Sequence, residues 1–183
     1  MKGKWAKGIQ PRFFAWIIKG RLAISERPGG YARNHRRVRR QEEILWLRGE
    51  GFTRVVSLLP SPHNLHAYDE LGVTWSHVPL GPHDDPNVVL AELYTRVREW
   101  LGAGERILIH QEELGDRLMG VVAGYLRWSG MVPSGPQAIA VVERIIGRQM
   151  GPPGRELVAS VPNLPGPGQD LPGPGQAAQP LGS

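Results

Sequence analysis

Short apolar runs alternate along this sequence with longer segments of helical periodicity. The clearest runs are Thr53–Leu59 and Arg106–His110, which read TRVVSLL and RILIH. Runs this short and this rich in Val, Ile and Leu are typical of strands that are buried on both faces of a sheet. The helical segments between them predict right-handed crossovers, which join parallel strands. We therefore expect an α/β fold with a mainly parallel central sheet that is flanked by helices.

The expected strands are rich in β-branched and aromatic residues. They lie at Phe13–Ile18, Arg21–Ile24, Thr53–Leu59, Val73–Leu80 and Arg106–His110. The expected helices lie at Asn34–Arg48, Asn64–Leu71, Val88–Leu101, Arg117–Trp128 and Pro136–Arg148. Val38 is an expected inward position of the first helix and Ile145 of the last, and Ser134 is a candidate cap for the last helix.

The segment after residue 150 differs in composition from the rest. Residues 151–183 are dominated by Pro, Gly, Gln and Ala, and the string LPGPGQ occurs at Leu164–Gln169 and again at Leu171–Gln176. Proline removes backbone donors and glycine raises chain entropy, so little apolar area offsets the cost of ordering. We expect one folded domain over residues 1–150 and a disordered tail over 151–183. This tail is either passive or a ligand for a proline-recognition domain.

Charge and cysteine content exclude some functions. The chain has 183 residues, no cysteine and a formal net charge of +5, with a sequence pI near 10.0. Disulfides, thiolate metal sites and thiol nucleophiles are therefore excluded, and acidic partners are favoured. The apolar run Phe13–Ile18 is cut by Lys19 and is too short to span a membrane or to act as a signal peptide. We expect a cytoplasmic protein.

The strand at Arg106–His110 leads directly into the loop QEELGD and then into a helix. In an open parallel sheet, ligands bind at the carboxyl ends of the strands, and a tight loop before a helix presents backbone amides to an anion. This segment is therefore the candidate site.

The string HQEELGDR, His110–Arg117, resembles the signature of the cysteine-dependent protein phosphatases, specifically the small atypical dual-specificity group. That signature is His, Cys, five residues and Arg. The resemblance extends over residues 14–148 and includes FAWIIKGRLAIS, GFTRVVSLL and GVTWSHVPLGPHDD, in the family's order. It implies the phosphatase fold.

The resemblance also implies roles for individual residues. In the family, the cysteine takes the phosphoryl group, the arginine clamps its oxygens and an aspartate on another loop protonates the leaving group. These positions correspond to Gln111, to Arg117, and to Asp84 or Asp85. A carboxamide is far less nucleophilic than a thiolate, so Gln111 should not form a phosphoenzyme.

Other positions of the loop depart from the family pattern as well. Leu114 occupies the place of a glycine, Gly115 follows one position later, and Leu118 replaces a hydroxyl residue. The loop contains three acidic residues, Glu112, Glu113 and Asp116, and a single arginine. The sequence therefore predicts a pseudophosphatase with a degenerate phosphate loop, a relict general acid and no cofactor, which binds an unidentified protein partner.

Structural roles are the alternatives for several of these residues. Acidic side chains stabilise a helix start, which would explain Asp116 and the two glutamates before it. His110 ends a buried strand and fits a hydrogen-bonded core histidine. A metal-assisted phosphoesterase remains open if His83, Asp84 and Asp85 meet the loop glutamates, although no metal site is specified by the spacing.

A basic string, RNHRRVRR, lies at the start of the first expected helix. Its arginines are Arg33, Arg36, Arg37, Arg39 and Arg40. On a helix they would form a basic patch that makes a weak, salt-sensitive contact with nucleic acid. A solvated helix face is the alternative.

Overall fold

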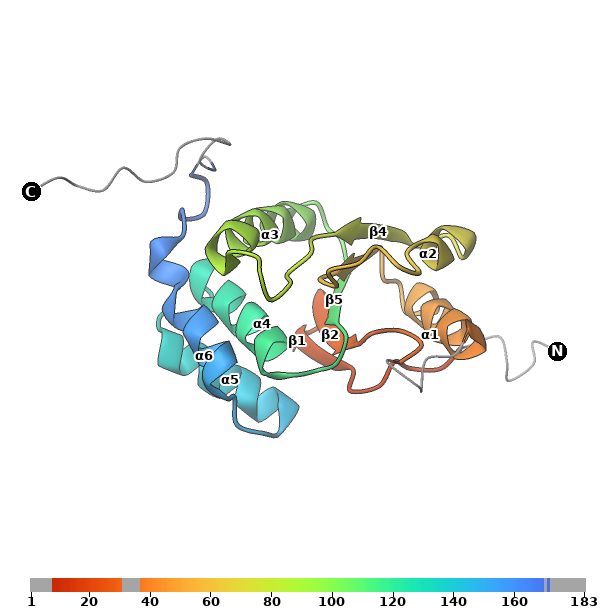
Figure 1. Cartoon of the computed structure of the whole chain (residues 1–183), viewed down its shortest axis with the longest axis horizontal. Helices are drawn as coiled ribbons and strands as arrows, with labels where there is room; N and C mark the ends of the chain where they lie inside the picture. The colour runs from red at the N-terminus through yellow and green to blue at the C-terminus, as the bar shows by residue number, and fades with distance from the viewer. Residues whose placement is uncertain (1–7, 31–36, 170, 172–183) are drawn as a thin grey trace, which may run out of the picture.

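A five-stranded sheet forms the centre of the molecule, with the strand order β1-β2-β5-β3-β4 (Figure 1). The computed structural model describes residues 8–30, 37–169 and 171. The strands are β1 (Ala15–Ile18), β2 (Leu22–Glu26), β3 (Arg54–Ser57), β4 (Thr74–His77) and β5 (Ile107–Gln111). Only the β1–β2 pair is antiparallel, whereas β2–β5, β5–β3 and β3–β4 are parallel. The prediction of a mainly parallel α/β fold is confirmed.

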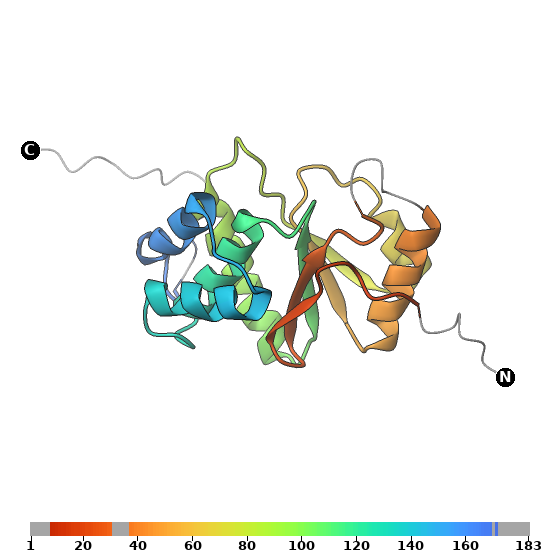
Figure 2. The same cartoon turned by 90° about the horizontal axis from the view of Figure 1, so that it is seen from below.

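Helices cover both faces of this sheet, as Figure 2 shows. The helices are α1 (Arg37–Gly49), α2 (His66–Glu70), α3 (Pro86–Gly102), α4 (Asp116–Trp128), α5 (Gly135–Ile146) and α6 (Pro152–Ala159). Side chains of β5 alternate between two cores: Ile107 and Ile109 pack with α3 to α6, and Leu108 packs with α1 and α2. This alternation explains why the run RILIH is apolar throughout.

Capping residues begin two of the helices. Asp85 accepts a hydrogen bond from the backbone N–H of Asn87 at the start of α3, and Ser134 accepts one from Gln137 at the start of α5. The predicted cap at Ser134 is confirmed. Two predicted inward positions are wrong, because Val38 is 66% exposed and Ile145 is 38% exposed.

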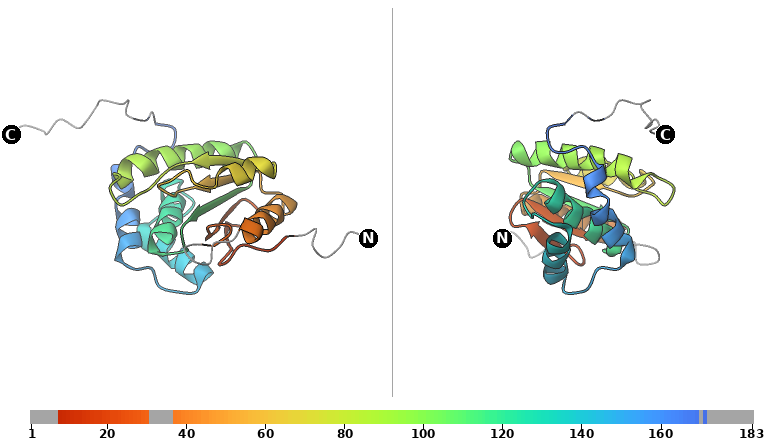
Figure 3. Two further views of the ribbon diagram at one scale, coloured as in Figure 1. Left: turned by 45° about the vertical axis from the view of Figure 1, so that its right-hand side comes forward. Right: turned by 90° about the vertical axis from the view of Figure 1, so that its left-hand side faces the viewer.

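The folded domain continues past residue 150, contrary to the predicted tail. Helix α6 is followed by a short 3-10 helix, η3 (Val161–Asn163). Leu157, Val158 and Val161 are buried in the core that contains α4. Figure 3 shows α6 on the side of the molecule opposite α1. The tail prediction is wrong for 152–163, while residues 170 and 172–183, which include most of the second LPGPGQ string, lie outside the described residues.

Glycine allows α6 to approach α4 unusually closely. A Cβ atom at Gly120 would lie 2.5 Å from the Cα of Gly154, and one at Gly154 would lie 2.3 Å from the backbone oxygen of Asp116. No side chain larger than hydrogen fits such a contact. The glycines that made residues 151–183 look disordered therefore include one that permits a close helix packing.

Candidate functional site

The loop between β5 and α4 forms one wall of a pocket of about 510 Å³ at the carboxyl ends of the parallel strands. Figure 2 shows the loops that follow β3, β4 and β5 gathered at this end of the sheet. The loop contributes Gln111, Glu112, Glu113, Gly115, Asp116 and Arg117 to the lining. The other lining residues are apolar: Leu58, Leu59, Pro60, Leu80, Pro82 and Pro153. The strand–loop–helix segment of the sequence therefore borders a pocket, at the expected edge of the sheet.

His110 lies near the end of β5, just before the loop, and is shielded from solvent. The side chain is 2% exposed, and its Nδ1 lies 3.1 Å from the backbone oxygen of Gln111. Its Nε2 lies 3.5 Å from the hydroxyl of Tyr68. Burial lowers the pKa of His110 to about 4, against the opposing effect of the Gln111 hydrogen bond. A neutral, buried imidazole supports the loop and does not line the pocket.

Two of the three acidic side chains of the loop form ion pairs with arginines outside it. Glu112 accepts a hydrogen bond from Arg27, with 3.0 Å between Oε1 and Nη1. Asp116 lies 2.9 Å from Arg148 and accepts a hydrogen bond of 2.9 Å from the N–H of Gly151. The Gly151 N–H and, to a smaller extent, Arg148 hold the pKa of Asp116 below its usual range. The excess negative charge that the loop sequence suggests is largely compensated.

Arg117 and Glu113 remain without an ion-pair partner among the residues that the structure describes. Arg117 is half-buried and lines the pocket, as does the half-buried Gln111. The backbone N–H groups of residues 112–118 also have no acceptor in the described part of the chain. The pocket thus presents a guanidinium and a carboxamide to a ligand.

The departures from the family pattern have visible structural roles. Leu114 packs against the large core, and Leu118 is fully buried in it. Gly115 is extended, with φ −109° and ψ −174°, and a Cβ atom there would meet nothing closer than 3.7 Å. Glycine is therefore not required by the backbone at position 115, and the two leucines anchor the loop through apolar contacts.

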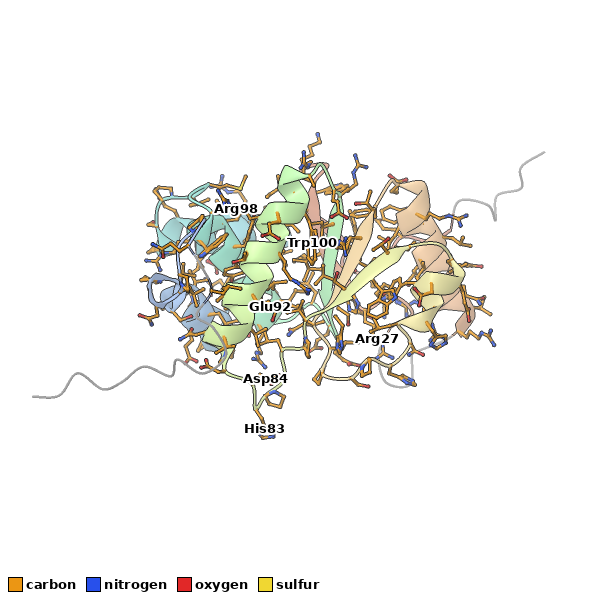
Figure 4. The ribbon with its side chains drawn as sticks, turned by 90° about the horizontal axis from the view of Figure 1, so that it is seen from above. Arg27, His83, Asp84, Glu92, Arg98 and Trp100 are labelled. Carbon is orange, nitrogen blue, oxygen red and sulfur yellow. The ribbon has the colours of Figure 1, made fainter. Side chains whose placement is uncertain are left out.

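The predicted general-acid residues hold their own loop in place. Asp84 accepts a hydrogen bond of 2.6 Å from the N–H of Gly81, and Asp85 caps α3. Neither lines the pocket, although Pro82 of the same loop does. Figure 4 shows Asp84 and His83 on a loop that projects from this end of the molecule. The two aspartates thus stabilise local structure, and their assignment as relict acids stays a prediction.

The structure does not assemble the metal-binding group that the sequence left open. In the described part of the chain, no three His, Cys, Asp or Glu side chains are grouped so that they could hold a metal ion. His83, Asp84 and Asp85 are adjacent in the sequence, but they do not meet Glu112 or Glu113 in such a cluster. Over the same residues, no helix has the length and apolar content needed to cross a membrane.

The basic segment before and within α1 is less exposed than expected. Arg40 is only 8% exposed, and burial lowers its pKa. Arg39 lies 2.6 Å from Glu43 and 3.7 Å from Glu26. Placing both on an open basic face is therefore wrong, and Arg37 is exposed. Arg33 and Arg36 lie outside the described residues.

A buried ionic cluster beside the loop was missed by sequence reasoning. Glu26 and Glu43 are each 1% exposed, and Glu43 accepts hydrogen bonds from Arg39 and from the N–H of Gly29. Burial raises the pKa of Glu26, an effect that Arg39 opposes. Glu26 pairs with Gln111 in the β2–β5 register. The available signal was a glutamate at the end of a buried strand, where a charged residue needs a partner.

Comparison with solved structures identifies the fold, whereas no protein-family profile and no curated protein sequence matches the chain. A mutant form of Tk-PTP is 26% identical, covers 81% of this chain and 94% of its own, and has a TM-score of 0.62. Kinase associated phosphatase with its catalytic site cysteine replaced by serine is 20% identical, with coverages of 84% and 96% and a TM-score of 0.69. Human DUSP28 is 18% identical, with the same coverages and a TM-score of 0.58. The chain therefore has the fold of the protein tyrosine and dual-specificity phosphatases.

Proposed function

We propose that this protein is a non-catalytic phosphatase-like domain that binds a partner protein through its degenerate pocket. One observation carries the proposal: the pocket of a phosphatase fold contains Gln111 where the family has its cysteine, and the chain has no cysteine elsewhere. A carboxamide is neutral and lacks the nucleophilicity of a thiolate, so no phosphoenzyme can form at this position.

The remainder of the pocket supports binding. Arg117 lines it and is not consumed by an internal ion pair in the described residues. Glu112 and Asp116, which would repel an anion, are paired with Arg27 and Arg148. Leu114 and Leu118 anchor the loop in the core. A pocket with fixed walls and unpaired donors suits recognition better than it suits chemistry that needs a nucleophile.

A solved neighbour supports the idea that the fold persists without the thiol. The kinase associated phosphatase structure carries serine in place of its catalytic site cysteine and still overlays on this chain with a TM-score of 0.69. This fold therefore forms without the thiol nucleophile. A chain with Gln111 can keep the scaffold for another use.

The two alternatives receive less support from the geometry. Nucleic-acid binding through α1 would use arginines of which Arg40 is buried and Arg39 is paired with glutamates. A metal-assisted phosphoesterase would need a ligand cluster, which the described residues do not form.

Turnover of para-nitrophenyl phosphate by the purified full chain tests the proposal. We expect no release of nitrophenol above that of an Arg117→Ala variant. Comparison with this variant separates activity of the pocket from a contaminating phosphatase, since Arg117 lines the pocket. Turnover by the wild type that disappears in Arg117→Ala would refute the non-catalytic assignment.

A further inference from the structure

The ionic side chains of the pocket differ in whether they are available to a ligand. Glu112 and Asp116 are engaged by Arg27 and Arg148. Arg117 therefore supplies the one unpaired cation of the pocket wall, counted over the described residues. A ligand that enters this pocket meets a single guanidinium.

The unpaired Glu113 limits the charge that the pocket accepts. It lines the same pocket as Arg117 but forms no ion pair with it in the described chain. One guanidinium offsets one negative charge, whereas a second charge on the ligand gains no further cation and is repelled by Glu113. Removal of an ion from water also costs more as its charge rises. The pocket is matched to a monoanion better than to a dianion.

The shape of the available donors favours a carboxylate. A guanidinium presents parallel N–H groups that fit the two oxygens of a planar carboxylate. Gln111 adds a neutral carboxamide, whose NH₂ group can donate to the same ligand without changing the charge.

The remainder of the pocket lining is apolar. It includes Leu58, Leu80, Pro82 and Pro153, so the group attached to the carboxylate should be apolar too. Pro153 comes from α6, which means that the segment past residue 150 contributes to recognition.

We propose that the pocket binds a monocarboxylate joined to an apolar group, and that the partner protein supplies it as an acidic side chain flanked by apolar residues. This inference rests on the proposed function, since it names the chemistry by which the non-catalytic pocket recognises its partner. Two matched small probes test it. Phenylacetate carries one negative charge, whereas phenyl phosphate at about pH 8 carries two on the same ring.

Binding of the probes to the full ¹⁵N-labelled chain is followed by the amide shifts of residues 112–117. We expect phenylacetate to bind about fivefold more tightly than phenyl phosphate. Arg117→Ala should abolish the shifts caused by both probes. Arg117→Lys should weaken the binding of phenylacetate about fivefold, because lysine cannot make the bidentate contact. Glu113→Gln should tighten the binding of phenyl phosphate about fivefold and that of phenylacetate by a smaller factor. Arg96→Ala, which removes an exposed arginine paired with Glu92, is the matched control and should leave both unchanged.

The blocked peptide acetyl-Leu-Glu-Leu-amide, with its Gln counterpart as control, distinguishes the two sources of a carboxylate. We expect the Glu peptide to bind more tightly than phenylacetate and the Gln peptide not to bind. Binding of phenylacetate without binding of the Glu peptide would overturn the proposal that a partner protein supplies the carboxylate, and would indicate a small carboxylic acid as the ligand.

Two further outcomes separate failure of this inference from failure of the proposed function. Binding of phenyl phosphate as tight as or tighter than that of phenylacetate, with no phenol released, would overturn the carboxylate assignment alone, as would the absence of any shift. Release of phenol that depends on Arg117 would instead overturn the non-catalytic function.

Discussion

Replacement of Gly120 by alanine should destabilise the domain, because it forces α4 and α6 apart. The new Cβ atom would lie 2.5 Å from the Cα and the backbone oxygen of Gly154 and 2.8 Å from its carbonyl carbon. Non-bonded carbon atoms prefer separations of about 3.5–4.0 Å. All three contacts are with backbone atoms, so no side-chain rotation relieves them, and the helices must separate by about 1 Å.

The expected loss can be worked out from opposing effects. Overpacking of a well-packed core costs about 1–3 kcal/mol, and the upper end applies because the neighbour is backbone. Alanine regains about 1 kcal/mol of helix propensity relative to glycine. The net loss is about 2 kcal/mol, which corresponds to a fall in Tm of about 4–8 °C for a chain of this size.

Thermal and urea unfolding, followed by circular dichroism, measure this effect. Gly102→Ala is the matched control, because Gly102 ends α3 and a Cβ atom there meets nothing within 4 Å. We expect the control to have an unchanged or slightly higher Tm. If Gly120→Ala unfolded at the same temperature as the control, the close packing of α6 on α4 would be refuted.

Three more predictions concern the pocket and its support. Gln111→Cys alone should not give family-like turnover of para-nitrophenyl phosphate, because Leu114 and Leu118 still fix the loop in the core; rapid turnover would show that the loop path is already competent. The buried His110 has a pKa near 4, below its ordinary 6.5, so the unfolded chain takes up the proton first and stability falls by about 3 kcal/mol as the pH drops from 6.5 towards 4. His110→Gln should flatten that pH dependence in urea unfolding, and an unchanged slope would contradict a neutral buried imidazole. Asp116→Ala should lower the unfolding free energy by about 1–2 kcal/mol and Asp116→Asn by less, because asparagine can still accept the hydrogen bond from Gly151; equal losses would show that the ion pair with Arg148 dominates.

Features that depend on local sequence could be predicted. The buried runs at Thr53–Leu59 and Arg106–His110 coincide closely with β3 and β5, and the helical segments between the runs predicted correctly that these strands are parallel. The position of the pocket could also be predicted from local sequence. A strand, a tight loop and a helix in succession indicate a ligand site at the carboxyl ends of the parallel strands. Ser134 as a cap is a further local signal that holds.

Features that depend on distant partners could not be predicted. Glu112 and Arg27 are 85 positions apart in the sequence, and Asp116 meets Gly151 across 35 positions. Nothing near either acidic residue indicates its partner, so the loop looked more strongly negative than it is. Arg39 and Arg40 looked solvated for the same reason, because their burial depends on the packing of α1.

Helix α6 was missed because composition outweighed periodicity. Pro and Gly dominate residues 151–183, yet apolar residues recur there at short intervals: Leu157 and Val158 are buried on α6, and Val161 and Leu164 are buried in the segment that follows it. A proline in the first turn of a helix is favourable, since its missing N–H would be unpaired there anyway. The same residues that suggested disorder therefore begin the helix.

The hydrogen bond from the N–H of Gly151 to Asp116 has a practical consequence for where the domain ends. A fragment that ends at Met150 would lose Gly151, which donates to Asp116, the contribution of Pro153 to the pocket, and helix α6, which packs against α4. Trp128 donates a hydrogen bond to the backbone oxygen of Pro165, so the folded unit extends to about that residue. An expression boundary placed after Gly168 keeps the pocket and the hydrophobic core in one piece.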